Sequence, residues 1–143
     1  MPTHAEKRRL PHSPEQMFAL VADVEKYPEF LPWCVATRVR GQDGDTITAD
    51  MVIGYKMFRE RFTSKVHLDR PGLRIDVAYS EGPFKYLNNH WLFIADGEGT
   101  IVDFYVDFEF RSRLLQKLIG AVFNEAVKIM VHAFEKRAKN VYG

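Results

Sequence analysis

The sequence is poor in cysteine, in charge of one sign and in long apolar runs, and each shortage excludes a class of protein. A single cysteine, Cys34, excludes an internal disulfide and a multi-cysteine zinc site. The 20 basic and 19 acidic residues leave a net charge of +1, so DNA is not an expected partner. No apolar run approaches the roughly 20 residues of a membrane-spanning helix. We expect one domain over residues 1–143, working in a reducing compartment such as the bacterial cytoplasm.

Cofactor and metal motifs are also missing. The five histidines are scattered, with no pair four residues apart and no HExxH arrangement, so no zinc ligand set is predicted. The Gly-Glu-Gly run at 97–99 fits a hairpin turn, and neither GxGxxG nor a phosphate-binding GxxxxGK occurs. Cys34 follows Trp33 in an apolar setting, which favours a small buried side chain over a reactive thiolate. We expect no cofactor and no metal.

The clearest pattern present is an alternating strand followed by a long amphipathic helix. The strand is predicted over Ile101 to Phe110, where apolar and polar side chains alternate as in a half-buried strand. The helix is predicted from Ser112, its N-cap, to about Asn140. Its apolar stripe contains Leu115, Ile119, Val122, Phe123, Ala126, Met130, Ala133 and Phe134. Because a short turn joins the two apolar surfaces, we expect them to face each other.

Shorter elements precede this pair. A weak strand over Thr3 to Leu10 is followed by Ser13-Pro14-Glu15-Gln16, a capping box that opens a short helix. From Asp23 to Cys34 we predict an apolar loop with two prolines. Five further strands are predicted over Val35 to Arg40, Asp45 to Gly54, Arg59 to Leu68, Leu73 to Ser80 and Lys85 to Ala95, separated by turns such as Gly41-Gln42-Asp43-Gly44. The predicted fold is α+β: a curved seven-stranded antiparallel sheet wrapped around a long C-terminal helix, the helix-grip arrangement.

Within this layout, several segments resemble one known family. They are DVEKYPEFLPWC, RFTSKVHLDRP, GPFKYLNNHWLF, IVDFYVDFEFRSRLL and AFEKRAKNVYG. They resemble the coenzyme Q-binding protein and ribosome association toxin family, a branch of the START-like polyketide cyclase/dehydrase superfamily, and the resemblance covers Asp23 to Gly143. It implies a single START-like domain that binds a lipid or quinone for respiratory ubiquinone function, with a bacterial branch that acts on the ribosome.

An apolar pocket between the sheet and the C-terminal helix is the predicted site. Small side chains such as Ala126 that face a curved sheet leave volume unfilled, although from the pattern alone aromatic rings could equally fill it as a solid core. The resemblance favours a pocket, of a kind that is mainly apolar with a few polar groups. The predicted ligand-binding residues are Phe30, Leu31, Trp33, Met51, Ile53, Phe62, Ser64, Val66, Val77, Tyr79, Trp91, Phe93, Phe104, Val106, Phe108, Ile119, Val122, Phe123, Ala126 and Met130. Hydroxyl or amide groups, such as those of Tyr79, Ser64 or Asn89, would place a headgroup.

Two further features have alternative interpretations. The apolar segment from Tyr27 to Trp33 is either a packed loop that seals one end of the sheet or a lid that contacts a membrane during lipid transfer. Nearby Lys26 and the Lys7-Arg8-Arg9 cluster either contact anionic headgroups there or are simply solvated. A peripheral position at the bacterial inner membrane follows if the segment is a lid that contacts a membrane.

Three functions fit these observations. The first is non-enzymatic binding of ubiquinone or a related polyprenyl lipid, in support of respiration or ubiquinone biosynthesis. The second is toxin-like association with the large ribosomal subunit that blocks subunit joining, through a basic face comprising Arg111, Arg113, Lys117, Lys136, Arg137 and Lys139. The third is a polyketide cyclase or dehydratase, which needs inward acid and base groups. Glu60 is the one carboxylate that the alternation places inward, and its alternative role is an ordinary ion pair at the open end of the sheet beside Arg59 and Arg61. We expect that the protein is not an enzyme.

Overall fold

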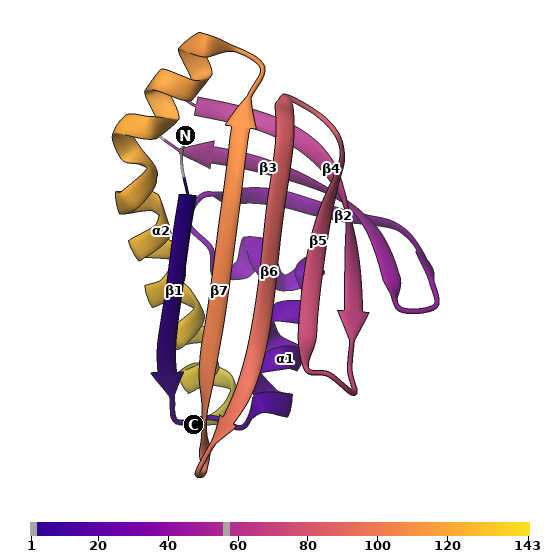
Figure 1. The fold of residues 1–143 in the computed structure, drawn as a ribbon, viewed down its shortest axis with the longest axis vertical. Coiled ribbons are helices and arrows are strands. Elements are labelled where there is room, and N and C mark those ends of the chain that lie inside the picture. Colours follow the sequence, from indigo (N-terminus) through magenta and orange to yellow (C-terminus); the bar gives the residue numbers. More distant parts are fainter. Residues whose placement is uncertain (1–2, 56–57) are drawn as a thin grey trace.

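The computed structural model describes residues 3–55 and 58–143 and contains one sheet with three helical segments. In chain order the elements are β1 (Thr3–Leu10), α1 (Pro14–Ala22), the 3-10 helix η1 (Val24–Glu29), β2 (Cys34–Asp43), β3 (Thr46–Tyr55), β4 (Phe58–Asp69), β5 (Arg74–Glu81), β6 (Phe84–Asp96), β7 (Gly99–Phe110) and α2 (Arg113–Tyr142). Apart from η1, the order is that predicted from the sequence (Figure 1).

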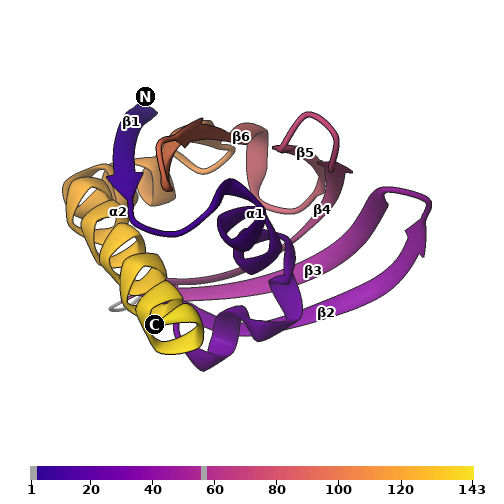
Figure 2. The same ribbon diagram turned by 90° about the horizontal axis from the view of Figure 1, so that it is seen from below.

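The seven strands form one antiparallel sheet in the order β1-β7-β6-β5-β4-β3-β2. The sheet curves, so that α1 lies within its concave side and α2 crosses the open side between the β1 edge and the η1 segment next to β2 (Figure 2). The predicted helix-grip arrangement is therefore confirmed. Such curvature separates α2 from the middle of the sheet and makes room for a cavity there.

Side-chain caps fix where both helices begin. The Ser13 hydroxyl accepts a hydrogen bond from the Gln16 amide at 3.2 Å, and the Gln16 side chain accepts one from the Ser13 amide at 3.0 Å, which completes the predicted capping box. At α2 the Ser112 hydroxyl accepts from the Leu115 amide at 3.2 Å. Gly143, with φ of 86°, caps the C-terminal end. These caps explain why the predicted helix boundaries are close to the observed ones.

Two local predictions were wrong. Residues 41–43 were expected to form a turn but belong to β2. A register shift between Val39 and Gly41 lets the strand continue to Asp43. The hairpin turn is therefore shorter than predicted, and it contains Gly44 with φ of 61°. The segment after Asp23, expected to be an open loop, winds into η1 with Pro28 inside it. The short helix directs the side chain of Tyr27 into the core.

On the sheet face opposite the cavity, Asp50 is buried at 4% exposure within a polar cluster. It accepts hydrogen bonds from the Thr63 hydroxyl, from Arg61 at 3.0 Å and from Arg40 at 2.8 Å. These hydrogen bonds, of which that from Thr63 has the largest effect, outweigh the cost of burying the charge and lower the pKa of Asp50 to about 2.

Acid should therefore weaken the fold through Asp50. Its carboxylate stays ionised in the folded state to about pH 2 but takes up a proton near pH 4 when unfolded, so this stabilisation is complete above about pH 4 and is lost as the pH falls toward 2. We expect Asp50→Asn to lower the free energy of unfolding at pH 7 by about 1–2 kcal/mol, since solvent around the two exposed arginines weakens the ion pairs. Urea denaturation between pH 2 and 7 measures this, and an unchanged acid limb in the variant would contradict it.

Candidate functional site, an apolar cavity under the C-terminal helix

A cavity of about 220 Å³ lies between the concave face of the sheet and α2. It sits between two hydrophobic clusters, one around α1 and the C-terminal half of α2, the other around the first turns of α2 and the end of β7. Its lining comprises Val21, Val24, Tyr27, Leu31, Trp33, Met51, Ile53, Phe62, Ser64, Val66, Ile75, Val77, Phe84, Leu87, Asn89, Trp91, Phe104, Val106, Phe108, Phe110, Ile119, Phe123, Ala126, Val127, Met130 and Phe134. The core is therefore not solidly filled by aromatic rings.

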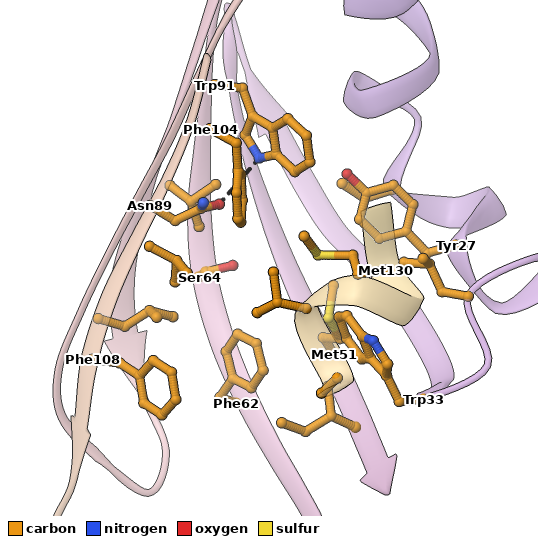
Figure 3. Close-up of a pocket in the computed structure, with 18 of the residues that line it drawn as sticks. Tyr27, Trp33, Met51, Phe62, Ser64, Asn89, Trp91, Phe104, Phe108 and Met130 are labelled. Carbon is orange, nitrogen blue, oxygen red and sulfur yellow. Dashed lines mark hydrogen bonds between the residues drawn. The ribbon is translucent and has the colours of Figure 1, made fainter. Parts of the chain in front are cut away.

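Strand alternation and small side chains create this space. On β4 every second residue, Phe62, Ser64 and Val66, faces the cavity, and the short Ser64 side chain leaves room at the middle of the wall. On α2 the small Ala126 faces the same volume. Figure 3 shows Ser64 between Phe62 and Asn89 on the sheet side, with Met130 of α2 opposite.

Few polar atoms reach the cavity, and most of them are already hydrogen-bonded. Asn89 donates to the Tyr105 carbonyl at 2.8 Å and accepts from the Trp91 indole nitrogen at 3.2 Å. The Tyr27 hydroxyl donates to the Val21 carbonyl, and burial raises the pKa of Tyr27 well above its ordinary value. Trp33 differs, because its buried indole nitrogen has no hydrogen-bond partner among the described residues.

Most of the predicted ligand-binding residues line this cavity. They are Leu31, Trp33, Met51, Ile53, Phe62, Ser64, Val66, Val77, Trp91, Phe104, Val106, Phe108, Ile119, Phe123, Ala126 and Met130. That they contact a ligand stays a prediction.

Four predicted residues, Phe30, Tyr79, Phe93 and Val122, lie outside the lining. Phe30 packs against Phe134 with ring centroids 5.2 Å apart, and Phe93 packs against Phe18 of α1 with ring centroids 5.9 Å apart. The Tyr79 hydroxyl accepts from the Phe84 amide at 3.1 Å, so it is held in the wall rather than presented to a headgroup. Val122 packs at the edge of the helix stripe, beside the cluster of Phe84 and Phe108.

Several lining residues were missed in the sequence. Val21 and Val24 come from the short helical segments that lie within the curve of the sheet, where only the three-dimensional arrangement brings them to the cavity. Phe84 was missed because a register shift between Phe84 and Tyr86 breaks the alternation that Leu87, Asn89 and Trp91 follow. Ile75, Phe110, Val127 and Phe134 obey the alternation or the helix stripe and could have been included.

Acid–base groups are scarce at this site. Glu60, expected inward, pairs in register with Ile53 but is outside the cavity lining. Among the described residues that form the lining there is no carboxylate, imidazole, ammonium or guanidinium group. No cluster of three metal-ligating side chains occurs within residues 3–55 and 58–143. The described wall of the cavity can bind and orient an apolar molecule.

Cys34 is buried, as predicted, at 4% exposure. Burial raises the pKa of its thiol to about 11, so the unreactive thiol form dominates at neutral pH. We expect alkylation of Cys34 by iodoacetamide at pH 7.5 to be at least about tenfold slower in the folded protein than in urea. Mass spectrometry at successive times measures both rates. Equal rates in the two states would contradict this placement.

The segment from Tyr27 to Trp33 is packed against the protein. Tyr27 and Leu31 are buried, and both line the cavity together with Trp33, while Pro28 and Pro32 face outward. The structure thus supports the interpretation of a loop that seals one side of the cavity.

The cations considered for headgroup contact are largely engaged in ion pairs. Arg8 pairs with Glu6 and Glu135, Arg9 with Asp96 at 2.9 Å and Lys26 with Glu29 at 3.5 Å. No helix of the described ranges is long and apolar enough to cross a bilayer.

Comparison with known proteins agrees with this fold. Residues 10–135 match the family model described as polyketide cyclase / dehydrase and lipid transport. A ribosome association toxin RatA from Rickettsia prowazekii is 40% identical over 92% of each chain. The mitochondrial coenzyme Q-binding protein COQ10 homolog B from Xenopus laevis is 34% identical over 98% of this chain and 59% of its own length.

Among solved structures, an 18 kDa protein from Caulobacter crescentus is 37% identical, covers 100% of this chain and 99% of its own, and superposes with a TM-score of 0.82. Together with the curved sheet and the long C-terminal helix, these similarities show that the chain belongs to the RatA/COQ10 family of the START-like polyketide cyclase/dehydrase superfamily.

Proposed function

We propose that this protein associates with the ribosome. The observation that carries the proposal is its 40% identity, over nearly the whole chain, to a protein named ribosome association toxin. A second such relative, from Escherichia coli, is 36% identical over 99% of this chain. The same proposal includes that this chain blocks the joining of the ribosomal subunits.

The distribution of charge supports an RNA-binding surface on α2. The net charge of +1 does not reveal it, because acidic residues elsewhere in the chain offset the basic helix. Helix α2 carries six lysine or arginine residues and two glutamates, a net charge of +4, so the rest of the chain is slightly acidic. Arg113, Lys117, Lys128, Lys136 and Lys139 are exposed. Arg137 of the predicted basic face is half-buried and pairs with Glu29 at 3.2 Å, which leaves it less available. A basic helix of this kind suits contacts with RNA phosphates.

Sedimentation with purified ribosomal subunits tests this proposal. We expect the protein to pellet with the large subunit at low salt and to be released as salt rises, because each phosphate contact adds about 0.7–0.9 to the slope of log affinity against log salt. Protein that stays in the supernatant with either subunit at every salt concentration would contradict it.

A second candidate is favoured by the cavity itself: we propose that it holds ubiquinone or a related polyprenyl lipid. The wall of the cavity is apolar apart from a few heteroatoms, and one relative is named a coenzyme Q-binding protein. Burial of apolar carbon stabilises such a complex by roughly 0.8 kcal/mol per methylene group. Ligand carriage and ribosome association are compatible, since the basic residues of α2 are exposed while the cavity lies beneath the helix.

The size of the cavity limits what it can enclose. A cavity of about 150 Å³ holds a benzene ring, so about 220 Å³ accommodates a ring with a few additional carbon atoms. A longer isoprenoid tail would need to leave through an opening or to widen the cavity. We therefore propose that the enclosed part of the ligand is its ring and the first carbons of its tail.

Organic extraction of the purified protein followed by mass spectrometry tests the second candidate. After expression in a host that makes ubiquinone, we expect a quinone or polyprenyl lipid in the extract at a substantial fraction of the protein concentration. An extract without such a molecule would count against ligand carriage and would leave ribosome association unaffected.

We propose further that the protein binds without catalysing a reaction. Cyclisation or dehydration of a polyketide requires an acid and a base that converge on one reacting atom. Among polar groups, the described lining offers only the hydroxyls of Ser64 and Tyr27, the Asn89 amide and the indole nitrogens of Trp33 and Trp91, which supports binding. Conversion of a polyketide substrate by the purified protein would overturn this proposal.

A further inference from the structure

A groove on the surface lies next to the cavity, with one side chain between them. It has a volume of about 610 Å³ and runs between Thr3, at the start of β1, and the first turns of α2. Its α2 side consists of Arg113, Gln116, Lys117, Gly120, Phe123 and Asn124. Figure 1 shows the start of β1 beside these turns of the helix. The groove is a second hollow, and its walls are far more polar than those of the cavity.

Phe123 forms part of the wall of both hollows, and among the described residues no other is in both linings. Between ring centroids, it lies 5.3 Å from Phe108 of the cavity wall and 6.5 Å from His4 on β1. The residue is half-buried. A ligand too long for the cavity reaches the groove once this one ring turns aside.

The polar groups of the groove are those that bind anions. Arg113 and Lys117 are exposed, and neither forms an ion pair within residues 3–55 and 58–143. The described lining contains no acidic side chain. The side-chain oxygen of Gln116 accepts from the Phe110 amide at 2.8 Å, which leaves the amide nitrogen of Gln116 to donate elsewhere. With Asn124, the groove thus offers two cations and two amide groups, a set that suits an oxyanion.

Gly120 keeps the groove open. A Cβ atom built on this residue has no other atom within 4 Å, so no close packing requires a glycine there. Glycine within a helix lowers stability relative to alanine. Since Gly120 is part of the lining, a larger side chain at this position would take up space in the groove. A role in keeping that space free accounts for the glycine.

We propose that this groove binds an oxyanion, a carboxylate or a phosphate, at the end of the ligand that emerges from the cavity past Phe123. The described lining of the cavity has no charged group, so a charged end is not stabilised inside it. The inference rests on the proposal that the cavity encloses the ring of a polyprenyl lipid, and it narrows that ligand to one with an anionic group. Such a group would engage two of the exposed cations of α2 and leave Lys128, Lys136 and Lys139 for RNA.

Two probes of the same shape separate charge from apolar burial. 6-Phenylhexanoate ends in a carboxylate, and 6-phenylhexanamide ends in a neutral amide of nearly the same size. Calorimetry gives the ratio of their affinities, in which their shared apolar burial cancels. We expect the wild-type protein to prefer the carboxylate about tenfold, because two exposed ion pairs contribute a few-fold each. In Arg113→Gln/Lys117→Gln the preference should fall to about twofold or less.

A control and a second variant separate the groove from long-range charge. Arg38→Gln/Lys65→Gln removes one exposed arginine and one exposed lysine on β2 and β4, outside both linings, and should leave the preference unchanged. Gly120→Leu keeps every charge but fills space in the groove. It should lower the preference about threefold or more, because the carboxylate no longer approaches the two cations closely.

The outcomes distinguish this inference from the proposal on which it rests. If both probes bind but the wild type shows no preference, the groove proposal is refuted and the cavity proposal stands. The same holds if the preference survives in either variant or falls equally in the control. Acetate that binds as tightly as 6-phenylhexanoate would mean a simple anion site unconnected with the cavity, which also refutes the inference. If neither probe binds, the cavity proposal fails and the groove proposal with it.

Discussion

Replacement of Ala126 by phenylalanine should abolish ligand binding while leaving the protein folded. Ala126 lines the cavity from α2, and a phenyl ring there would occupy most of a space of about 220 Å³, since a benzene ring fills a cavity of about 150 Å³. We expect the affinity for acetophenone, a single ring with three further heavy atoms, to fall at least about 100-fold, or about 2.7 kcal/mol. Calorimetry measures the affinity, and lipid extraction reports whether the copurifying ligand is lost.

Ala121→Phe is the matched control, because Ala121 lies on the exposed side of the same helix. It adds the same ring without filling the cavity, so binding should be unchanged. Thermal unfolding of both variants shows whether binding is lost because the cavity is filled or because the protein no longer folds. Overpacking lowers the free energy of unfolding by about 1–3 kcal/mol. Undiminished binding in folded Ala126→Phe would show that the ligand binds elsewhere.

Charge reversal at the start of α2 should produce the second large effect. Arg113 and Lys117 are exposed one helical turn apart, so Arg113→Glu/Lys117→Glu removes two cations from one face of the helix and adds two anions. We expect the affinity for the ribosome to fall at least about tenfold at low salt, and the salt dependence of sedimentation to become shallower by about two phosphate contacts.

The control for this experiment is Lys7→Glu/Lys65→Glu, which changes the net charge by the same amount on exposed positions of the sheet. If ribosome binding depends on α2, the control should bind nearly as well as the wild type. An equal loss in both double variants would mean that overall charge alone governs sedimentation and that α2 has no special part in it.

The fold could be predicted because its signals are local. The capping box at Ser13, the turn residues between strands and the alternation of Val102, Phe104 and Val106 each act within a few residues along the chain. The register shifts could not be predicted in this way. The register shift between Val39 and Gly41 extends β2, and the register shift between Phe84 and Tyr86 turns Phe84 inward. Both shifts depend on how the strand pairs with its neighbours.

The site was predictable to the extent that it follows these periodicities. The stripe on α2 identified Ile119, Phe123, Ala126 and Met130 correctly as cavity-facing residues. By contrast, Phe93 obeys the alternation of β6 and still misses the cavity, because α1 covers it. Hydrogen-bond partners cannot be read from the sequence either. It does not reveal that Arg8 bonds to Glu135, or that the indole N–H of Trp33 has no acceptor within the part of the chain that the structure describes.

The most direct test of ribosome association follows the native protein in a cell lysate. After centrifugation through a sucrose gradient at low salt, immunoblotting should find it in the fractions that contain ribosomal particles, and at high salt it should shift to the top of the gradient. A protein that remains at the top under both conditions, while ribosomal particles migrate normally, would contradict the account and leave ligand carriage as the better-supported function.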